Sequence, residues 1–542
     1  MKREELRKER FDMIKTDLFL PYGYGTDEVK EAIASALPVR RDEIGEIRLL
    51  KRELRVVDGA RPVYKATVAF SSSIEKEEGL LKLRNKVHRH ECEELTLPHV
   101  SMPFRPVVVG AGPAGLFAAL VLAESGARPI VLERGLPVEE RGRSIERFEK
   151  LGILDPESNV QFGEGGAGTY SDGKLKVGSR DKYKMKVLTE FVLGGADESA
   201  LYSVGAHLGT DKLPGIVRYI REKIISLGAE FIFSARLTDL VIKDSRLKGV
   251  VYEKDGKREE LDTGAVILAT GHSARDTLMM LKSKGLRMTP KGFGIGLRIE
   301  HPREYINGIV YKDASDVIKE TASYHLVTHL SGGRSVYSFC MCPGGTVVGA
   351  ASESGGIVTN GMSEYARMAD NSNSALLVSV TPEDFGSDDP LAGVELQRKI
   401  ERRAFSLTSS YRAPTSRLAE LLEGGAVGSS ADVVPSYLPG TEIVSPRNYL
   451  PDFIVDSIAR AMPDFDAWLP GFAYGGAALT GPETRTTSPV RIERTDAKEA
   501  LGFEGIYPSG EGAGYAGGIV SSAVDGIYSA EALIEKYAVK DN

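Results

Sequence analysis

The most regular apolar pattern of the chain lies between residues 107 and 134. It begins with Val107–Val109, a short β-branched run that predicts a strand. Leu116–Ala123 is apolar throughout and predicts a helix, and Pro129–Leu132 predicts a second strand. The pattern therefore predicts strand, tight turn, helix and strand in direct succession.

The first hundred residues mix the two periods of secondary structure. Val29, Ile33 and Leu37 share one face of a helix, whereas segments on either side alternate as strands do. The resulting order, β-α-β-β-α-β, is that of a ferredoxin-like sandwich, and Asp58-Gly59 predicts its hairpin turn. Nothing here predicts catalysis, so we interpret the region as a docking or packing domain. The predicted elements are Thr16–Leu20, Asp27–Leu37, Glu46–Val57, Val63–Ser71, Ser73–Lys86 and Glu93–Leu97.

Helices and then a meander of short strands are predicted after residue 134. Thr210 or Asp211 is the expected cap of the third helix, and Asp255-Gly256 predicts a turn that separates the last two strands. The helices cover Arg141–Leu151, Tyr183–Gly195 and Leu213–Leu227, and the strands cover Glu230–Ala235, Arg236–Lys243, Gly249–Lys254 and Val266–Thr270.

Residues 289–479 have a different pattern, in which strand-like segments alternate with loops and two long helices. We interpret them as an inserted α+β domain, after which the chain returns to a strand, a glycine-rich turn and a long helix. The predicted strands are Gly294–Glu300, Arg334–Cys340, Thr346–Ala351, Ala375–Val380 and Ile506–Ser509, and the helices are Leu391–Phe405, Pro451–Met462 and Ile519–Lys536. The predicted division is 1–100 for the N-terminal domain, 101–288 and 480–542 for a nucleotide-binding domain, and 289–479 for the insertion.

Composition narrows the class of protein. A chain of 542 residues is too long for one core, and its length predicts roughly three to four domains. The formal net charge of −7 gives no bulk attraction to nucleic acid or to an anionic membrane, and no run of about 18 apolar residues predicts a membrane span. Three cysteines predict no disulfide framework, and the charged N-terminus lacks the apolar core of a signal peptide. We therefore expect a cytoplasmic protein.

Three glycines mark the junction between the first strand and its helix. Gly110, Gly112 and Gly115 form G-x-G-x-x-G, in which the first makes a tight turn, the second admits a pyrophosphate and the third permits close helix–strand packing. The helix N-terminus then faces the phosphates. Glu133 ends the second strand, where a carboxylate accepts hydrogen bonds from a ribose and disfavours a 2′-phosphate. The sequence therefore predicts a dinucleotide site.

Further glycines accumulate at three other places. The loop Asn159–Leu175 has few side chains, so its backbone can contact a flat or phosphorylated ligand, and the alternative is a flexible loop. A buried strand ends in Thr270-Gly271, and Gly510–Gly518 opens the last helix as a second strand–glycine–helix junction.

Candidate chemistry near these loops is sparse. His272 follows Gly271 and is a candidate general acid or base, with an ordinary loop histidine as the alternative. Arg275 is a candidate ligand for a carboxylate or phosphate. Cys340 and Cys342 would share a face of a continuous strand, either as a dithiol relay or as two small buried residues.

Two other clusters have weaker patterns. Arg298, Glu300 and His301 would either orient a substrate or form a surface ion cluster. His88, His90, Cys92 and His99 match no established zinc spacing, so solvated linker residues are the favoured interpretation and no metal site is predicted.

The motifs GAGPAG with Glu133, ILATG at Ile267–Gly271 and SGEGAGYAGG at Ser509–Gly518 together resemble those of the FAD-binding flavoproteins of the glutathione-reductase-like superfamily. The chain is most similar to a bacterial group described only as FAD-dependent dehydrogenases, and less similar to fumarate-reductase and tRNA-uridine-modifying flavoproteins. The loops HLGTDKL, ATGHSARD, YSFCMCPGG and TNGMS resemble the narrower group.

The resemblance implies an α/β fold in which a Rossmann-type FAD-binding domain with a β-meander carries an inserted substrate domain. It implies that the first glycine motif holds the pyrophosphate, that Glu133 holds the adenosine ribose, and that Glu511 lies near the ribityl–pyrophosphate part. It also implies that Gly517–Ile519 brings N–H groups to the pyrimidine edge of the flavin. The expected FAD-binding residues are Gly110, Gly112, Pro113, Ala114, Gly115, Glu133, Arg134, Gly166, Gly168, Lys174, Thr270, Gly271, Gly510, Glu511, Gly517, Gly518 and Ile519, and the catalytic candidates are His272 and Cys342.

The expected function is an FAD-dependent oxidoreductase that moves a hydride between a small organic substrate and flavin N5. No second G-x-G-x-x-G opens a βαβ unit, so NAD(P)H is expected only as a transient donor. The alternatives are an RNA-modifying flavoenzyme, which needs a basic surface track and conflicts with the acidic average, and a non-enzymatic flavin-binding module. The N-terminal domain is the expected docking surface for a partner or a second copy of the chain.

Overall fold

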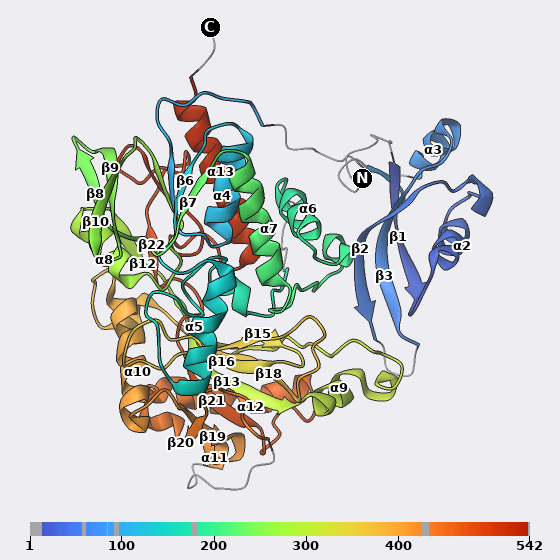
Figure 1. Ribbon diagram of the computed structural model, residues 1–542. Coiled ribbons are helices and arrows are strands. Elements are labelled where there is room, and N and C mark those ends of the chain that lie inside the picture. Colours follow the sequence, from blue (N-terminus) through green and yellow to red (C-terminus); the bar gives the residue numbers. More distant parts are fainter. Residues whose placement is uncertain are drawn as a thin grey trace.

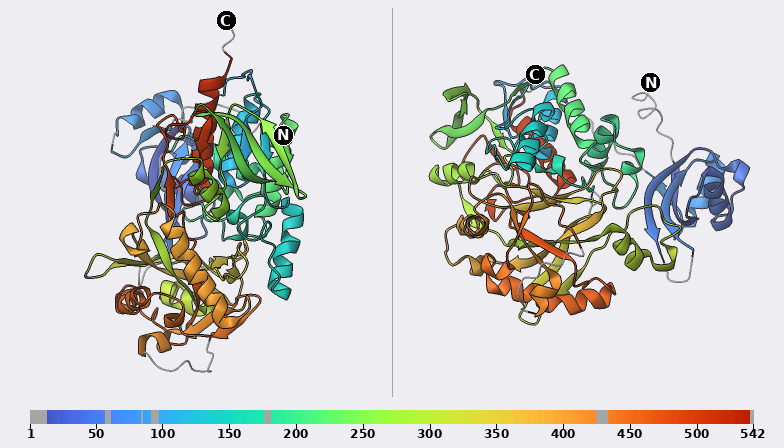
Figure 2. Two further views of the ribbon diagram at one scale, coloured as in Figure 1. Left: turned by 90° about the vertical axis from the view of Figure 1, so that its left-hand side faces the viewer. Right: turned by 60° about the horizontal axis from the view of Figure 1, so that its bottom comes forward.

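A computed structural model describes residues 13–56, 61–83, 85–90, 97–175, 181–423 and 433–539. The chain forms a two-part body with a smaller N-terminal unit at its side (Figure 1). Figure 2 shows that this unit projects from the body. Among the described residues, no helix combines the length and the apolar character that crossing a membrane requires.

A five-stranded parallel sheet in the order β23-β11-β5-β6-β7 forms the centre of one part of the body. Val108 on β5 pairs with Val131 on one side and Ile267 on the other, so the predicted strands meet in parallel. Gly510, Gly271 and the first glycine motif all follow strands of this sheet. The strands are β5 (Val107–Val109), β6 (Ile130–Leu132), β7 (Glu230–Ile232), β11 (Val266–Leu268) and β23 (Ile506–Pro508).

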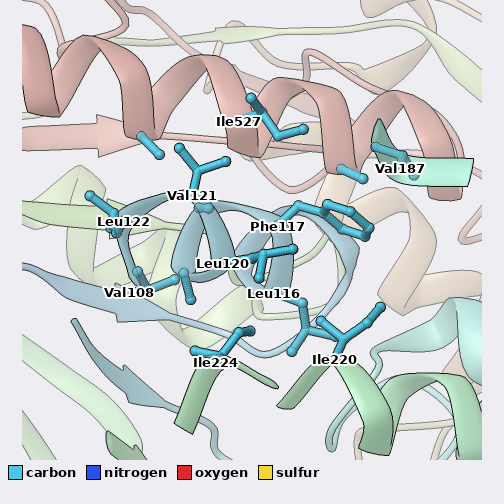
Figure 3. Packing of buried hydrophobic residues seen from close by; sticks show 14 of the residues in the cluster. Val108, Leu116, Phe117, Leu120, Val121, Leu122, Val187, Ile220, Ile224 and Ile527 are labelled. Atoms are coloured by element: carbon cyan, nitrogen blue, oxygen red, sulfur yellow. The ribbon is translucent and has the colours of Figure 1, made fainter. Parts of the chain in front are cut away.

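The predicted apolar helix is α4 (Pro113–Glu124), and it is buried along nearly its whole length. Figure 3 shows that it lies between Ile527 of α13 (Ile519–Tyr537) and Ile220 and Ile224 of α7 (Leu213–Ser226). A helix without a polar face needs neighbours on all sides, which explains why distant segments pack around this one. Helices α5 (Val138–Leu151), α6 (Lys184–Leu193) and α8 (Arg275–Ser283) complete this part.

Two predictions for this part are wrong. Lys212, not Thr210 or Asp211, is the N-cap of α7, and it makes no side-chain cap; the Asp211 carboxylate instead accepts a hydrogen bond from the Tyr365 N–H at 2.6 Å. The meander consists of β8 (Arg236–Lys243), β9 (Arg246–Lys254) and β10 (Lys257–Asp262), whereas β7 joins the parallel sheet. The turn at Asp255-Gly256 joins β9 to β10, a charged edge strand whose weak alternation concealed it.

The inserted segment builds a seven-stranded sheet in the order β14-β15-β18-β13-β21-β19-β20. Its central strands, β13 (Phe293–Pro302) and β18 (Asn371–Val380), are buried almost throughout, and α10 (Ala392–Thr408) and α12 (Asp452–Trp468) pack on the sheet. The sheet extends to Glu483, beyond residue 479. The other strands are β14 (Val327–His329), β15 (Ser335–Cys342), β19 (Ala413–Arg417), β20 (Thr441–Ile443) and β21 (Ala478–Glu483).

Smaller elements connect the two parts. A two-stranded sheet of β16 (Thr346–Gly349) and β17 (Thr359–Met362) lies beside the large sheet, and β12 (Met288–Pro290) pairs with β22 (Val490–Ile492) where the chain enters and leaves the insertion. The remaining helices are α9 (Arg303–Tyr311) and α11 (Leu418–Glu423).

The N-terminal unit has the element order that the sequence predicts. Its four strands lie in the order β2-β3-β1-β4, and all its pairs are antiparallel. The predicted strand at Glu93–Leu97 falls largely outside the described residues, as do Asp58-Gly59 and Cys92, and β4 lies earlier. The elements are β1 (Met13–Pro21), α2 (Thr26–Ala36), β2 (Ile47–Arg55), β3 (Val63–Phe70), α3 (Ile74–Leu81) and β4 (His88–His90).

This unit contacts both parts of the body. Arg52 of β2 lies against the rings of Tyr64 and Tyr202, 5.0 and 5.2 Å from their centroids. The Tyr64 hydroxyl donates to the Glu320 carboxylate at 2.6 Å, and Tyr22 donates to the same group. Mixed aromatic and charged contacts of this kind are typical of packing between domains.

Candidate functional site

A cavity of about 310 Å³ lies where the parallel strands end and the inserted sheet begins. Open α/β sheets bind ligands at the carboxyl ends of their strands, which is where this cavity lies. Of the expected FAD-binding residues and the two catalytic candidates, all but Gly115 and Gly510 belong to its lining. Those that line it are Gly110, Gly112, Pro113, Ala114, Glu133, Arg134, Gly166, Gly168, Lys174, Thr270, Gly271, His272, Cys342, Glu511, Gly517, Gly518 and Ile519.

The first glycine motif has the geometry that its spacing predicts. Gly110 adopts φ +99°, and a Cβ there would lie 2.3 Å from the Ala269 carbonyl oxygen. A Cβ on Gly115 would lie 1.8 Å from the Gly110 carbonyl oxygen, so this glycine permits the helix to pack on the strand. A Cβ on Gly112 would meet only the Gly166 Cα, at 3.8 Å, so its backbone is open to the cavity.

Two helix N-termini reach the cavity. Gly112 and Gly518 are the N-caps of α4 and α13, and neither receives a side-chain cap. The N–H groups and positive dipole ends of these helices are therefore available to anionic groups of a ligand. A Cβ on Gly517 would meet nothing within 4 Å, so the cavity is open above α13 as well.

The Glu133 carboxylate gathers three loops at the nucleotide end of the cavity. It accepts N–H bonds from Ala111 at 2.8 Å, Gly135 at 2.9 Å and Gly163 at 3.0 Å. A carboxylate has about four acceptor positions, so one remains for a ribose hydroxyl. Its position fits the ribose role that the sequence predicts.

Arg141 anchors the second glycine loop and is a residue that sequence reasoning missed. Its fully buried guanidinium donates to five backbone carbonyls at 2.7–3.2 Å. Burial lowers the pKa of Arg141 to about 10, which leaves it charged at neutral pH. One side chain therefore fixes the loop. The only feature of the sequence that could have indicated this role is an arginine next to a glycine. The acceptors are Asn159, Val160, Gly163, Glu164 and Gly166.

Arg134 and Lys174 line the cavity but are already engaged. Arg134 donates to Glu157 at 2.8 Å and to Asp276 at 3.0 and 3.1 Å, while its plane lies 4.0 Å from the centroid of Phe162. The Lys174 ammonium donates to the Met341 carbonyl, and burial lowers its pKa. Lys174 thus ties the glycine loop to the inserted sheet.

The prediction that Arg275 binds a ligand is wrong. Its guanidinium donates to Glu401 at 2.7 and 2.9 Å, to Glu353 at 2.7 Å and to Gln397 at 3.1 Å. Arg485 donates to the same Glu401 carboxylate at 2.8 and 3.0 Å. The network fixes the inserted sheet to α8, because a buried charge must be paired.

His272 lies on the cavity wall in its neutral form. Its Nδ1 is 3.1 Å from the Ser273 hydroxyl, which in turn donates to the Gln161 side chain at 3.1 Å. Burial, with Arg485 and Arg275 close by, lowers the pKa of His272 to about 3. At neutral pH this imidazole can exchange hydrogen bonds with a ligand but cannot donate a proton as an imidazolium.

Both cysteines line the cavity, although the strand between them is interrupted. Cys340 adopts φ +39° in a bulge of β15 opposite β18, so the regular alternation that would give the pair one face is absent. Cys342 is buried, whereas Cys340 is exposed toward the cavity. The protein atoms around the two thiols raise the pKa of both. Both are free thiols in the structure.

The cluster Arg298, Glu300 and His301 is fully buried and is therefore not a surface ion cluster. The Glu300 carboxylate accepts from the side chains of Asn371 and Ser436, and His301 Nε2 lies 2.9 Å from the Phe472 carbonyl. Arg298 points toward the cavity wall and donates to the Cys340 carbonyl at 2.9 and 3.2 Å.

Two carboxyl groups at the cavity have raised pKa values. Burial raises the pKa of Glu483 to about 7, against the opposing effect of Arg298. Burial also raises the pKa of Glu511 to about 7, against the opposing effect of Lys291. Sequence reasoning found Glu511 but missed Glu483, which follows a proline at the end of a buried strand and carries no motif.

The residues present fit an FAD molecule. The cavity lining includes Glu133 after β6, Gly112 before α4, Gly271 after β11, Gly517 before α13, and Cys340 and Glu483 of the inserted sheet. Gly271 adopts φ +73°, and a Cβ there would meet nothing within 4 Å. Open backbone at Gly112, Gly271 and Gly517, together with two uncapped helix N-termini, suits a long ligand with phosphates.

Comparison with known proteins also indicates an FAD-dependent protein. The family model described as "FAD-dependent protein, C-terminal domain-like" matches residues 292–486. An uncharacterized protein of Clostridium beijerinckii is 43% identical over 522 residues, which cover 94% of this chain and 96% of that protein. Digeranylgeranylglycerophospholipid reductase 1 of Methanopyrus kandleri is 28% identical over 179 residues, 32% of this chain and 41% of that protein. A solved structure of a triple mutant of the flavin-dependent brominase Bmp2 aligns over 81% of both chains with 12% identity and a TM-score of 0.38.

The fold and the cavity thus define an FAD-dependent flavoprotein, and FAD is its cofactor. The chain belongs to the same family as the Clostridium beijerinckii protein, with which it aligns over nearly its whole length.

Proposed function

We propose that the protein is an FAD-dependent oxidoreductase that transfers a hydride between an unidentified small organic substrate and flavin N5. The observation that carries the proposal is the composition of the cavity, one wall of which is nucleotide-binding backbone and the other a separate sheet with buried titratable side chains. Pockets at such junctions commonly hold a cofactor and its substrate together. When bound, FAD supplies the two-electron chemistry.

In this proposal, the chain's own residues bind and orient the cofactor and the substrate. Gly112, Gly166 and the N-terminus of α4 would hold the pyrophosphate, Glu133 the adenosine ribose, and the N-terminus of α13 the pyrimidine edge of the flavin. The inserted sheet, through Cys340 and Glu483, would cover the reactive ring and exclude water from the substrate. The ion-pair network around Glu401 would keep that sheet in place.

Several finer points belong to the same proposal. We take residues 101–288 and 480–542 as a Rossmann-type FAD-binding domain, 289–479 as the core of the substrate domain, and 1–100 as a ferredoxin-like packing or docking domain. NAD(P)H would act as a transient donor that enters without a nucleotide-binding domain of its own. The charge balance and cysteine usage favour a cytoplasmic enzyme that acts on small molecules rather than RNA.

The test is anaerobic reduction of the bound flavin. Holoprotein is mixed with NADH, NADPH and a panel of neutral and acidic metabolites, and the visible flavin absorbance is followed. Bleaching by at least one compound, and its reversal by an oxidised partner, is the expected result. A flavin that dithionite reduces but no metabolite or pyridine nucleotide does would instead favour a non-enzymatic flavin-binding module.

A further inference from the structure

One buried carboxyl group faces the cavity without a hydrogen-bond partner. Glu483 is the last residue of β21, is 4% exposed and lines the cavity. Its Oε2 has no hydrogen-bond partner in the part of the chain that the structure describes. That atom faces the Arg298 Nε, which also has no hydrogen-bond partner among the described residues, so an ion pair holds one side of the carboxyl group. Because the residue also lines the cavity, a ligand there can supply a hydrogen bond that the protein does not.

Arg298 forms an ion pair with this carboxyl group but donates no hydrogen bond to it. The Arg298 Nε lies 3.4 Å from Glu483 Oε2, while both terminal nitrogens of the guanidinium donate to the Cys340 carbonyl. Tyr337 and Cys340 lie close enough for the charge of Glu483 to act on them, and burial together with that charge raises the pKa of each. Within the part of the chain that the structure describes, Arg298 is therefore the cation that acts on Glu483, and both neighbours on β15 are neutral at pH 7.

The surroundings allow Glu483 to gain and lose a proton near neutral pH. Burial disfavours the carboxylate and Arg298 favours it, and the balance places the pKa of Glu483 at about 7. A group that works as both acid and base is most effective when its pKa lies near the working pH.

The cavity is built for a reacting group without charge. Its lining includes four cationic side chains, and each is already engaged within the described residues. Arg485 is held by Glu401, Lys174 by the Met341 carbonyl, and Arg236 by Glu253 at 2.9 Å, while Arg134 pairs with Glu157 and Asp276. A carboxylate or phosphate on the substrate would thus find no free cation to pair with.

We propose that Glu483 exchanges the proton of the redox reaction with a neutral substrate that carries a C–H bond next to an O–H or N–H group. This inference rests on the proposed oxidoreductase function. In oxidation, the C–H bond breaks and its electron pair leaves with the hydrogen as a hydride to FAD. The O–H or N–H proton passes to the Glu483 carboxylate, and a C=O or C=N bond forms. The acid then returns its proton to solvent, and reduction follows the same path in reverse.

The test uses the flavin of the intact holoprotein as the reporter. The visible flavin spectrum is recorded between pH 5 and pH 9 for the wild type, Glu483→Gln, Glu483→Asp, Glu511→Gln and Glu300→Gln. A carboxyl group that touches the ring changes the spectrum as it ionises, so the wild type is expected to show one transition near pH 7. Glu483→Gln should abolish the transition, and Glu483→Asp should keep it with a shifted midpoint.

The other two variants are matched controls. Glu511 also has a pKa of about 7 and lines the cavity. The resemblance to FAD-binding flavoproteins implies a position near the ribityl–pyrophosphate part, so Glu511→Gln should retain the transition. Glu300 is a fully buried carboxyl group of the same sheet that is paired with Ser436 and Asn371 away from the lining, so Glu300→Gln should retain it too.

The outcomes separate this inference from the function on which it rests. A wild-type holoprotein with no transition between pH 5 and pH 9, or a transition that Glu511→Gln removes and Glu483→Gln keeps, overturns the role of Glu483. If Glu483→Gln fails to fold, the wild type, Glu483→Asp and Glu511→Gln still decide. If metabolites bleach the flavin but its pH-dependent spectrum is the same in wild type and Glu483→Gln, the proton exchange is refuted. The proposed oxidoreductase function is then unaffected.

Discussion

The two walls of the cavity bind by different means. The wall formed by the parallel sheet presents backbone, through Gly110, Gly112 and the N-termini of α4 and α13. The wall formed by the inserted sheet presents side chains, among them Glu483 and Cys340, which a buried network supports. Backbone donors suit the phosphates of a nucleotide cofactor, and side chains suit the particular groups of a substrate. We therefore interpret the first wall as the cofactor side of the cavity and the second wall as the proposed substrate side.

The largest effect is expected where backbone packs on backbone in the first wall. Gly115→Val would place a side chain 1.8 Å from the Gly110 carbonyl oxygen, so α4 would have to leave the sheet. Overpacking of this kind costs at least about 1–3 kcal/mol and more where no side chain can yield. We expect loss of FAD binding and of the folded absorbance and circular dichroism spectra. Gly215→Ala, in the neighbouring helix α7 with nothing within 4 Å of the new Cβ, should leave both unchanged.

The next largest effect concerns the network behind the second wall. Glu401→Gln removes the charge that pairs Arg275 and Arg485, both of which are buried. An uncompensated buried charge costs about 3–5 kcal/mol, so thermal unfolding should occur at a clearly lower temperature. Asp389→Asn breaks the exposed pair with Lys282 and should cost less than about 1 kcal/mol. Equal losses in the two variants would show that the network does not support the wall.

Arg141→Lys is expected to weaken FAD binding, because Arg141 anchors the glycine loop of the first wall. Lysine keeps the charge but cannot reach five carbonyls in a planar fork, so the loop loses its anchor. We expect the dissociation constant for FAD to rise at least about tenfold, the equivalent of about 1.4 kcal/mol. Arg143→Lys, on the same helix, is the matched control. Unchanged affinity in Arg141→Lys would mean that the loop does not contact FAD.

The smallest effect is expected in the pH dependence of the stability of the apoprotein, where Glu511 and Glu353 should act with opposite signs. The folded-state pKa of Glu511 is raised to about 7, so its stabilising proton is fully present below pH 4.5 and is lost as the pH rises to 7. Glu353, beside Arg275 and Arg398, has its pKa lowered to about 2, so its contribution is present above pH 4.5 and is lost as the pH falls toward 2. Relative to wild type, Glu511→Gln should raise the unfolding temperature at pH 8, and Glu353→Gln should lower it at pH 7. The same sign for both variants would contradict these environments.

The sequence predicts the first wall well because its chemistry is local. A strand, three spaced glycines and a helix lie within one short segment, so Gly110, Gly112 and Gly115 could each be given a role before the fold was known. The second strand–glycine–helix junction, at Gly510–Gly518, is also local, and the structure has β23 before it and α13 after it. Even here, long-range contacts escaped prediction, since Arg141 reaches its loop only after the chain has folded.

The second wall could not be predicted because its partners are distant in sequence. Glu401 meets Arg275 across 126 positions, and Lys174 meets Met341 across 167, so no spacing rule connects them. Because its partners are distant in the sequence, Arg275 was predicted to bind a ligand. Glu483 escaped prediction because a single carboxyl group at a strand end has no motif, and only the fold brings it to the cavity beside Arg298.

The most direct measurement is the titration of purified apoprotein with FAD, followed by flavin absorbance and by thermal unfolding. The account predicts one FAD for each chain, resolved visible bands of a flavin in a protein site, and an unfolding temperature that rises with FAD concentration, because a ligand that binds only the folded state stabilises it. A folded protein that stays colourless, with an unfolding temperature that ignores FAD, would contradict the account.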